Sequence, residues 1–509
     1  MQGIIMKNLN FLFDLLLFPF LFILQFSLSQ KSSIYFHLRR QEGKRKLITT
    51  FLLVFGLGFT SSVAVTFTSG GTTPFVLVNP PNTRNVIGNY AIAGNTVLCL
   101  TEKETDFGGT CHGDTDYQDI TNNMHVVRYI DIDSNDGTWN STSSYIDFST
   151  TAYSPSRGII WAGLFWGGRI SVLYDHPKRY AVENGANSFK TVDAQGLFPF
   201  DITKTGATRI KLKVDNGNYN DVTASKFHTS PAYGGQTYSA YADVSSIVQA
   251  VPLDKGKHVF TVANLTTMEG REDAPGAFGG WSLVIIYAES YEFGSPKNIS
   301  IYNGFIDIGK NDTPIEISGF KLPTSGDVDA KISIFSGEGE HPYGPNDWMK
   351  ISRLVDSGYD YLDPTAANKN NMFDAKMTAI SRDKGTTGDM RYNALGTNNV
   401  GVEVDNFDVS TLMTNYRAAD QNINTVYVKT YSDLDYITTS MIAFSAEIYV
   451  PKLCYDYTLD IDGYVLDSVN NIIKTPFGGF GKPLTTVLYL KNLEGDIPLS
   501  NVDVNLYHQ

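Results

Sequence analysis

The sequence predicts an all-β protein, made of tandem β-sandwich or jelly-roll-like domains followed by the start of an Ig-like segment. Three observations predict this class. Aromatic residues make up 13% and charged residues 18% of the chain, which suits packed, pleated surfaces rather than a disordered chain. Apolar residues alternate with polar ones in several runs. Clusters of Gly, Asn, Asp and Pro separate these runs at short intervals, as turns separate strands.

Half-buried strands are predicted where apolar residues stand at every second position. Ile210, Leu212 and Val214 alternate with lysines, which is the period of a strand with one face in the core. The segment from Ile442 to Val450 repeats this spacing. Both segments are therefore expected to have one face against the core.

Continuous apolar runs predict strands that are buried on both faces. Ile159–Trp166 and Trp281–Tyr287 have the length of strands rather than of helices. The run Trp161–Gly168 has two interpretations, an aromatic platform for carbohydrate and an interior strand. Adjacent apolar residues with glycines between them favour the interior strand. Tyr241–Val251 is the one short helix that the sequence predicts.

Turn clusters divide the chain into domains. A first β-sandwich is expected over 65–293 and a second over 297–450, with a boundary at Phe293-Gly-Ser-Pro296. An incomplete Ig-like segment is expected over 451–509. These 59 residues are too few for a complete sandwich, so the sequence is expected to continue beyond Gln509.

Residues 39–64 have the three parts of a secretion signal. A basic stretch from Arg39 to Lys46 precedes the apolar stretch Leu47–Phe59, and small residues follow. Ser62 and Ala64 occupy the −3 and −1 positions of a small-x-small cleavage site, so cleavage is expected between Ala64 and Val65. The mature protein is therefore expected outside the cell or on its surface, exported by a Sec-type signal.

A second apolar run, Phe11–Leu28, precedes this signal. Its length suits a membrane span, although Asp14 lies within it. Two interpretations of residues 1–38 are open: a membrane-like leader, or translated upstream sequence that is not part of the native protein. The completeness of the second signal favours the non-native leader. Membrane attachment is expected only through these N-terminal segments or through an anchor beyond Gln509.

The charge excludes one class of partner. The chain has a net charge of −13, and its first 64 residues carry seven basic and two acidic side chains, a net of +5, so the remainder has −18. Binding to phosphates needs a basic surface, so no nucleic-acid partner is expected.

Three cysteines bear on the compartment. Cys99 and Cys111 are separated by eleven residues, and in an oxidising compartment they are expected to form a disulfide. Closing so short a loop contributes about 3 kcal/mol in the chain-entropy model. The alternative is two free thiols. Cys454 is left without a partner in the sequence.

The best metal candidate is the segment from Asp131 to Gly137. Asp131, Asp133, Asn135 and Asp136 offer the oxygen ligands that Ca²⁺ prefers. An EF-hand loop has Gly at the sixth place and Glu at the twelfth, whereas this segment has Asp136 and Thr142. The alternative is a turn, which the Asn-Asp-Gly sequence and the incomplete ligand pattern favour. Calcium is the one cofactor that the sequence suggests.

The motif Glu338-Gly-Glu340-His341 brings two carboxylates and an imidazole together. It is interpreted either as a metal or acid–base site or as a solvated acidic loop, which the single histidine favours. The sequence contains no Gly-x-Ser-x-Gly, no His-Glu-x-x-His and no phosphate-binding glycine loop. No catalytic residue is therefore predicted.

Several motifs in the same order resemble the N-terminal region of large bacterial surface proteins that carry repeats of the domain of unknown function eleven. The motifs are Asp131-Ile-Asp133, Thr138–Ser144, Ala162–Gly167, Gly280–Tyr287, Asn298–Phe305, Ser318–Pro323, Asn370–Phe373 and Val404–Asp408. Trp139, Thr142, Ala288 and Asn303 depart from the family pattern. The resemblance implies an exported multidomain β protein, and it supplies no catalytic residues.

Three functions are weighed. The first is a cell-surface or secreted protein with a structural or adhesive role and no catalysis. The second is a secreted, lectin-like carbohydrate-binding module, which the many aromatic residues suggest. The third is a calcium-dependent secreted hydrolase. A surface ligand or a glycan is the partner that the first two would bind.

Overall fold

The computed structural model describes residues 66–69, 73–101, 126–133, 135, 137–171, 178–181, 189–192, 206–232, 235–271, 276–308, 314–339, 347–362, 372–375, 377, 391–392, 399–432, 437–449, 453–461, 464–466 and 485–492. The predicted leader, the signal peptide and its cleavage between Ala64 and Val65 lie outside these ranges. Within the described residues, no helix is long and apolar enough to cross a bilayer.

An eleven-stranded sheet is the centre of the fold, and it has two parts. The N-terminal half-sheet contains, in spatial order, β1 (Thr66–Ser69), β12 (Lys226–Ala232), β13 (Gly235–Asp243), β7 (Ile159–Ser171), β16 (Gly279–Ala288) and β3 (Asn85–Thr96). The C-terminal half-sheet continues with β17 (Pro296–Ile308), β25 (Ile437–Glu447), β19 (Ala330–Gly337) and β23 (Val402–Asp408), while β2 (Thr73–Leu77) also pairs with β17.

Smaller sheets and short helices complete the described structure. One sheet contains β11 (Asn220–Thr223), β10 (Arg209–Val214), β14 (Lys257–Ala263), β6 (Ser141–Asp147) and β22 (Arg391–Tyr392), and another contains β4 (Leu98–Leu100), β5 (Val126–Tyr129), β15 (Met268–Arg271), β8 (Lys178–Ala181) and β9 (Phe189–Val192). A third contains β18 (Ile315–Ser318), β24 (Thr425–Tyr431), β20 (Trp348–Ser352) and β21 (Asp360–Tyr361), and a fourth contains β27 (Tyr464–Leu466), β26 (Leu453–Ile461) and β28 (Thr485–Asn492). The helices are η1 (Pro81–Thr83), α2 (Ser245–Gln249) and α3 (Ser410–Ala419).

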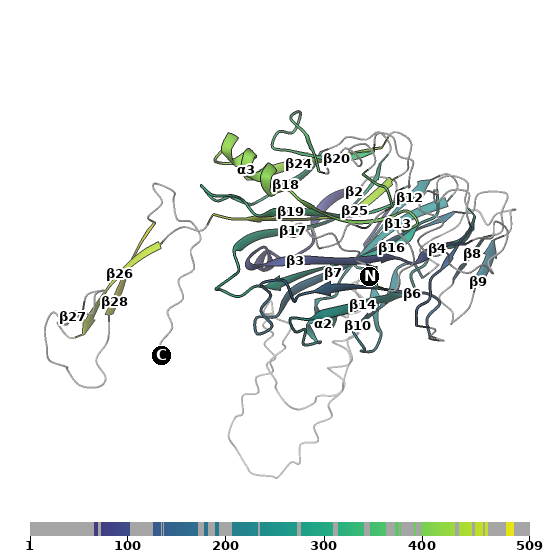
Figure 1. The fold of residues 1–509 in the computed structure, drawn as a ribbon, viewed down its shortest axis with the longest axis horizontal. Helices are drawn as coiled ribbons and strands as arrows, with labels where there is room; N and C mark the ends of the chain where they lie inside the picture. The colour runs from purple at the N-terminus through teal and green to yellow at the C-terminus, as the bar shows by residue number, and fades with distance from the viewer. Residues whose placement is uncertain are drawn as a thin grey trace, which may run out of the picture. The chain divides into compact units, whose positions relative to one another are not determined.

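Alternate side chains of the central strands enter different cores. In β16, Leu283 and Ile285 belong to a core shared with β6, β10 and β14, whereas Val284 and Ile286 belong to a middle core between the two half-sheets. In β25, Phe444 packs into a further core with β18, β20, β24 and α3. Within the described residues, the two half-sheets and the sheets that contain β10 and β20 thus form four β layers with three cores between them. Figure 1 shows these layers from β20 to β10. The all-β, sandwich-type class is confirmed.

The middle core needs very close packing of the two half-sheets. A Cβ atom on Gly280 of β16 would lie 2.7 Å from a methyl carbon of Val402 in β23. Glycine is therefore required at this position, because any larger side chain would push the half-sheets apart. The predicted domain boundary at residues 293–296 covers the end of the loop between β16 and β17 and the first residue of β17. These two strands belong to the same eleven-stranded sheet.

The strand predictions hold, with one correction. In β10 the residues Ile210, Leu212 and Val214 are buried and their neighbours are more exposed, and β7 and β16 are the interior strands expected from the apolar runs. The expectation of one buried face was wrong for the segment from Ile442, because all but the last residue of β25 is buried. β25 lies between two cores, so its small and polar residues are enclosed as well.

The helix prediction needs two corrections. Within Tyr241–Val251 only Ser245–Gln249 is helical, because β13 continues to Asp243. The sequence also gave no indication of α3, whose buried side chains are Met413, Tyr416 and Arg417. Since one of these three is charged, the apolar stripe is too weak to mark a helix.

Candidate functional site

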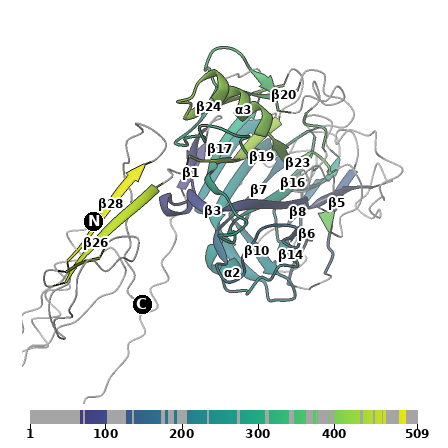
Figure 2. The same ribbon diagram turned by 60° about the vertical axis from the view of Figure 1, so that its left-hand side comes forward.

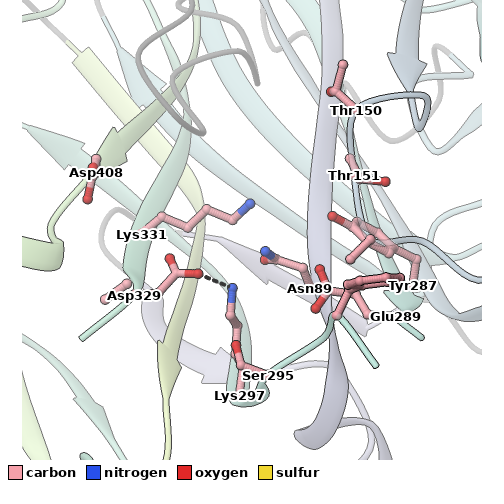
Figure 3. Close-up of a pocket in the computed structure, with 13 residues that line it drawn as sticks. Asn89, Thr150, Thr151, Tyr287, Glu289, Ser295, Lys297, Asp329, Lys331 and Asp408 are labelled. Atoms are coloured by element: carbon pink, nitrogen blue, oxygen red, sulfur yellow. Dashed lines mark hydrogen bonds and ion pairs between the residues drawn. The ribbon is translucent and has the colours of Figure 1, made fainter. Parts of the chain in front are cut away.

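A cavity of about 500 Å³ opens between β3 and β16 on one side and β17, β19 and β23 on the other. Most of its lining side chains are polar or charged, and they come from both half-sheets. They are Asn89, Thr150, Thr151, Ala152, Tyr287, Glu289, Phe293, Ser295, Lys297, Asp329, Ala330, Lys331 and Asp408. Figure 3 shows Asp329 and Lys331 on one side of the cavity and Asn89, Tyr287 and Glu289 on the other.

Two buried lysines supply positive charge. Lys297 in β17 is 3% exposed, and its Nζ lies 2.6 Å from Oδ2 of Asp329. Lys331 in β19 is 4% exposed; its Nζ donates to the carbonyl oxygen of Tyr90 at 2.8 Å and lies 4.4 Å from the centre of the Tyr90 ring. Both ammonium groups therefore have compensating partners, as buried charges require.

Glu289 supplies a buried acid. It directly follows β16, is 6% exposed, and pairs with Tyr153 through an isolated β-bridge. Burial raises the pKa of the Glu289 carboxyl above its ordinary value, and Lys297 and Lys331 oppose that rise. The same side chain can thus accept hydrogen bonds as a carboxylate or donate one as an acid.

Two exposed aromatic side chains follow Glu289 in the chain, and one of them lines the cavity. Among the described residues, the exposed large aromatics are Tyr291 and Phe293, at 75% and 74%, and Phe293 lines the cavity. The guanidinium of Arg157 lies 4.1 Å from the centre of the Tyr291 ring.

Tyr291 and Phe293 lie in the segment from Ser290 to Gly294, which we call the aromatic loop, and hydrogen bonds hold its backbone in place. Gly294 N donates to the Ser290 carbonyl oxygen at 2.8 Å, and Ser290 N donates to that of Ala152 at 3.0 Å. The loop therefore presents its rings from a defined backbone.

The arrangement resembles a binding site for a polar ligand. Small-molecule sites combine a cavity of this size with a few convergent polar groups and apolar or aromatic surface. Here ammonium groups, a carboxyl, an amide and hydroxyls line the cavity, and an exposed ring stands at its edge. These groups can donate to and accept from a ligand that carries several hydroxyls.

The loop predicted to bind calcium forms a hydrogen-bonded turn. Asn135 N donates to Oδ1 of Asp133 at 3.2 Å, Gly137 N donates to Oδ1 of Asn135 at 2.8 Å, and Ser141 Oγ donates to Oδ1 of Asp131 at 2.8 Å. These are Asx-type contacts within the loop and its flanking strand.

Asp133 has further partners, since Tyr219 donates its hydroxyl to Oδ2 and Thr138 donates to Oδ1. Burial favours a higher pKa for Asp133, but the hydrogen bonds from Tyr219 and the others lower it. For Asp131, burial raises the pKa. Among the described residues no group of three or more His, Cys, Asp or Glu side chains could hold a metal ion. Asp136 lies outside the described residues, so calcium in this loop stays a prediction.

The acidic motif at Glu338 differs from its favoured interpretation. Glu338 is 2% exposed, and its Oε1 accepts a hydrogen bond from Gly276 N at 2.8 Å. For this residue the expectation of a solvated loop was wrong, because its side chain is buried and its carboxyl group accepts a hydrogen bond from the Gly276 backbone. Glu340 and His341 lie outside the described residues.

The tryptophans of the predicted aromatic run lie inside the protein. Trp161 and Trp166 are 2% and 0% exposed and donate to Asp243 and to the Ala207 carbonyl oxygen. Trp161–Gly168 is therefore an interior strand and not a surface platform.

Cys99 lies buried in β4, whereas Cys111 is outside the described residues, so their disulfide stays a prediction. Cys454 lies in β26.

Sequence reasoning missed Glu289, Lys297, Lys331 and Phe293. The sequence pattern around Phe293 and Pro296 predicts a domain boundary, so it gives no reason to expect a binding residue at Phe293. One weak signal exists: Lys331 is the only charged residue in the otherwise apolar and small β19 segment. A lone lysine in such a strand usually has a specific buried partner.

Comparisons with known proteins give little further information. No family model matches the chain, and no curated protein matches it. Among solved structures, the chain is similar to PNGase F, a glycosylasparaginase from Flavobacterium meningosepticum, at 12% identity and a TM-score of 0.18 over 70% of this chain and 96% of that one. A second structure, described as BspA_C_WT, has 9% identity and a TM-score of 0.11 over 74% and 97%. At these TM-scores neither likeness carries information on fold or activity.

Proposed function

We propose that this chain is the ligand-binding part of an exported surface protein, and that the cavity between the half-sheets binds a hydroxyl-rich ligand such as a glycan. One observation carries the proposal. A cavity of about 500 Å³ combines buried, partnered charges with an aromatic ring that is 74% exposed at its edge. An adhesive role needs such a ligand site, so the proposal joins the adhesive and lectin-like functions suggested by the sequence.

The polar lining supports a neutral ligand with many hydroxyls. Lys297 is paired with Asp329, and Lys331 already donates to Tyr90. Positive charge in the cavity is therefore largely compensated, so an anion would gain little from it. Ligand hydroxyls can instead use the remaining hydrogen-bonding capacity of these groups and of Asn89.

The exposed rings support recognition of a ligand with an apolar face. When a ligand covers an exposed aromatic side chain beside a cavity, apolar surface is removed from water, which favours binding. A sugar ring has an apolar face of C–H groups and an edge of hydroxyls, which matches a ring beside a polar cavity. Phe293 is therefore expected to contact the ligand at the edge of the cavity, and Tyr291 beyond that edge.

The test is a glycan array probed with the full chain, followed by calorimetric titration of the best ligand. Phe293→Ala is expected to weaken binding about tenfold, since an aromatic contact contributes up to about 1.5 kcal/mol. Leu354→Ala is the matched control, because Leu354 is also an exposed apolar residue, at 43%, but does not line the cavity. It is expected to leave the affinity unchanged.

Two results would count against the proposal. If no glycan bound at millimolar concentration, a purely structural role would explain the chain better. If Phe293→Ala and the wild type bound equally well, the ligand site would lie elsewhere.

A further inference from the structure

A second group of buried polar residues lies at the opposite end of the β19–β23 ladder. β19 and β23 are adjacent strands (Figure 2), and they pair from Lys331–Asp408 at the cavity to Gly337–Val402 at the other end. Near this second end lie four acids whose exposure is 0–5%: Glu403, Asp405, Asp374 and Glu338. We call this group the acidic cluster.

Hydrogen bonds draw the segments of the cluster together around Glu403. Oε1 of Glu403 accepts a hydrogen bond from Ala375 N. Asn399 N donates to the Ala375 carbonyl oxygen at 2.9 Å, and Glu338 N donates to the Gly401 carbonyl oxygen. Three separate segments, at 338, 374–375 and 399–403, therefore meet at one buried carboxyl group.

The packing around Glu403 leaves no space for additional atoms on one side. A Cβ atom on Gly339 would lie 2.3 Å from Oε1 of Glu403 and 2.8 Å from the Phe373 carbonyl oxygen. The backbone also adopts left-handed conformations here, with φ of 77° at Glu338, 54° at Ala375 and 49° at Val400. Such conformations are costly for these residue types and persist only where the surroundings impose them.

Within the described segments at 338–339, 374–375 and 399–405, two buried side-chain oxygens have no hydrogen-bond partner. They are Oε2 of Glu403, which is 0% exposed, and Oδ1 of Asn399, which is 1% exposed. Both atoms are acceptors, and an unsatisfied buried acceptor is costly. This observation is independent of the number of acids in the cluster, and it indicates that a positively charged or donating group belongs at this place.

Two aspartates lie close enough to Glu403 to act on its carboxyl group. The pKa of Glu403 is raised well above its ordinary value, first by burial and then by the negative charges of Asp405 and Asp374. A buried acid with like charges beside it must bind a proton or a cation. A carboxylate, an amide oxygen and backbone carbonyls are the ligands that Ca²⁺ takes at six to eight positions.

We propose that the acidic cluster binds a divalent cation, with Ca²⁺ the best match, and that Oε2 of Glu403 and Oδ1 of Asn399 are direct ligands. Asp405 and Asp374 supply further negative charge beside the ion. No three carboxylates among the described residues could hold one metal ion, so amide, backbone carbonyl and water oxygens complete the coordination. The site is separate from the cavity and from the loop at Asp131.

The experiment uses the full chain after treatment with a chelator. Calorimetric titration with CaCl₂ is expected to show saturable binding, and the midpoint of thermal unfolding is expected to rise with added Ca²⁺. Glu403→Gln keeps the shape of the side chain and removes its charge, so it is expected to weaken Ca²⁺ binding at least about tenfold. The double variant Asp131→Asn with Asp133→Asn is the matched control and is expected to bind Ca²⁺ as the wild type does.

Two outcomes would overturn the proposal. Wild-type protein without any Ca²⁺ heat or thermal shift would mean that the cluster holds only protons. Unchanged binding in Glu403→Gln, together with loss in the double control, would place the ion in the predicted loop instead. If Glu403→Gln did not fold, Asn399→Ala would replace it, and the wild-type titration would still decide whether an ion binds.

Discussion

The two ends of the β19–β23 ladder bury charge in opposite ways. At the cavity end, Lys297 and Lys331 lie near the acids Glu289 and Asp329, so charges of opposite sign compensate one another. At the other end, Glu403 lies beside Asp405 and Asp374, so charges of like sign meet. The ends are six residues apart along β19, or about 20 Å. The same pair of strands thus has opposite charges near one end and like charges near the other.

The two buried glutamates show what this difference means. Burial raises the pKa of Glu289 and of Glu403 alike, but lysines oppose the rise at Glu289 and aspartates increase it at Glu403. Burial alone therefore does not decide how an acid behaves, because the sign of its neighbours decides whether the charged form is tolerated. At the cavity end the acid has cationic neighbours, and for the acidic cluster we propose a bound ion.

The largest effect is expected from making the cavity end resemble the acidic cluster. Lys331→Glu places a buried acid near Glu289, Asp329 and Asp408 and removes the hydrogen bond to Tyr90. The free energy of unfolding is expected to fall by about 3–5 kcal/mol, the cost of leaving a buried charge uncompensated. Urea unfolding at neutral pH measures it. Lys331→Met, the neutral control, is expected to cost clearly less, and equal losses would refute the role of charge.

A somewhat smaller effect is expected from disturbing the geometry of the acidic cluster. Gly339→Ala places a methyl group against Oε1 of Glu403 and the Phe373 carbonyl oxygen, so stability is expected to fall by about 1–3 kcal/mol. Calcium affinity is expected to fall with it, because the Glu403 carboxylate must move. Gly326→Ala, where nothing lies within 4 Å but φ is +80°, controls for backbone effects and is expected to leave Ca²⁺ affinity unchanged.

The pH dependence of stability separates the two glutamates. A raised pKa in the folded state means that the folded protein binds more protons, so stability is lost as the pH rises above the ordinary glutamate value near 4.5. Without Ca²⁺, the urea midpoint is expected to fall with rising pH, and Glu403→Gln is expected to flatten this slope. Glu289→Gln is expected to flatten it less, since the lysines oppose the shift at Glu289. The same slope in all three proteins would contradict the comparison.

The smallest effect is expected in the loop at Asp133, where protein donors already satisfy the carboxylate. Asp133→Asn weakens the hydrogen bonds from Tyr219 and Thr138, so a loss of about 0.5–1.5 kcal/mol is expected. The loss is expected to be the same in Ca²⁺ and in chelator. A loss that depended on Ca²⁺ would show that this loop, and not only the acidic cluster, binds the ion.

The strands could be predicted because their periodicity is local. The apolar positions of Ile210, Leu212 and Val214 specify one buried face, and the runs in β7 and β16 specify two, whatever the rest of the chain does. α3 could not be predicted in this way, since one of its three buried residues is Arg417, whose guanidinium donates to the carbonyl oxygens of Pro323 and Gly326. Its partners are distant in sequence, and a local pattern does not contain them.

The candidate sites were accessible to sequence reasoning only in part. Glu338 drew attention as part of an acidic motif, but Glu403, Asp405 and Asn399 join it from positions more than sixty residues away. Glu289 and Lys297 lie on either side of the domain boundary predicted at residues 293–296, and Lys331 lies in a different strand, β19. Nothing in the spacing of these residues could show that they line one cavity.

The sequence by itself determined the β class, the interior strands and the turns between them, because side-chain alternation and turn chemistry act over a few residues. Only the tertiary structure decided which half-sheets face each other, that Gly280 must lie against Val402, and which charges meet at each end of the β19–β23 ladder. The physical reason is that a buried charge is stabilised or destabilised by neighbours within a few ångströms, and the fold, not the order of residues, chooses those neighbours.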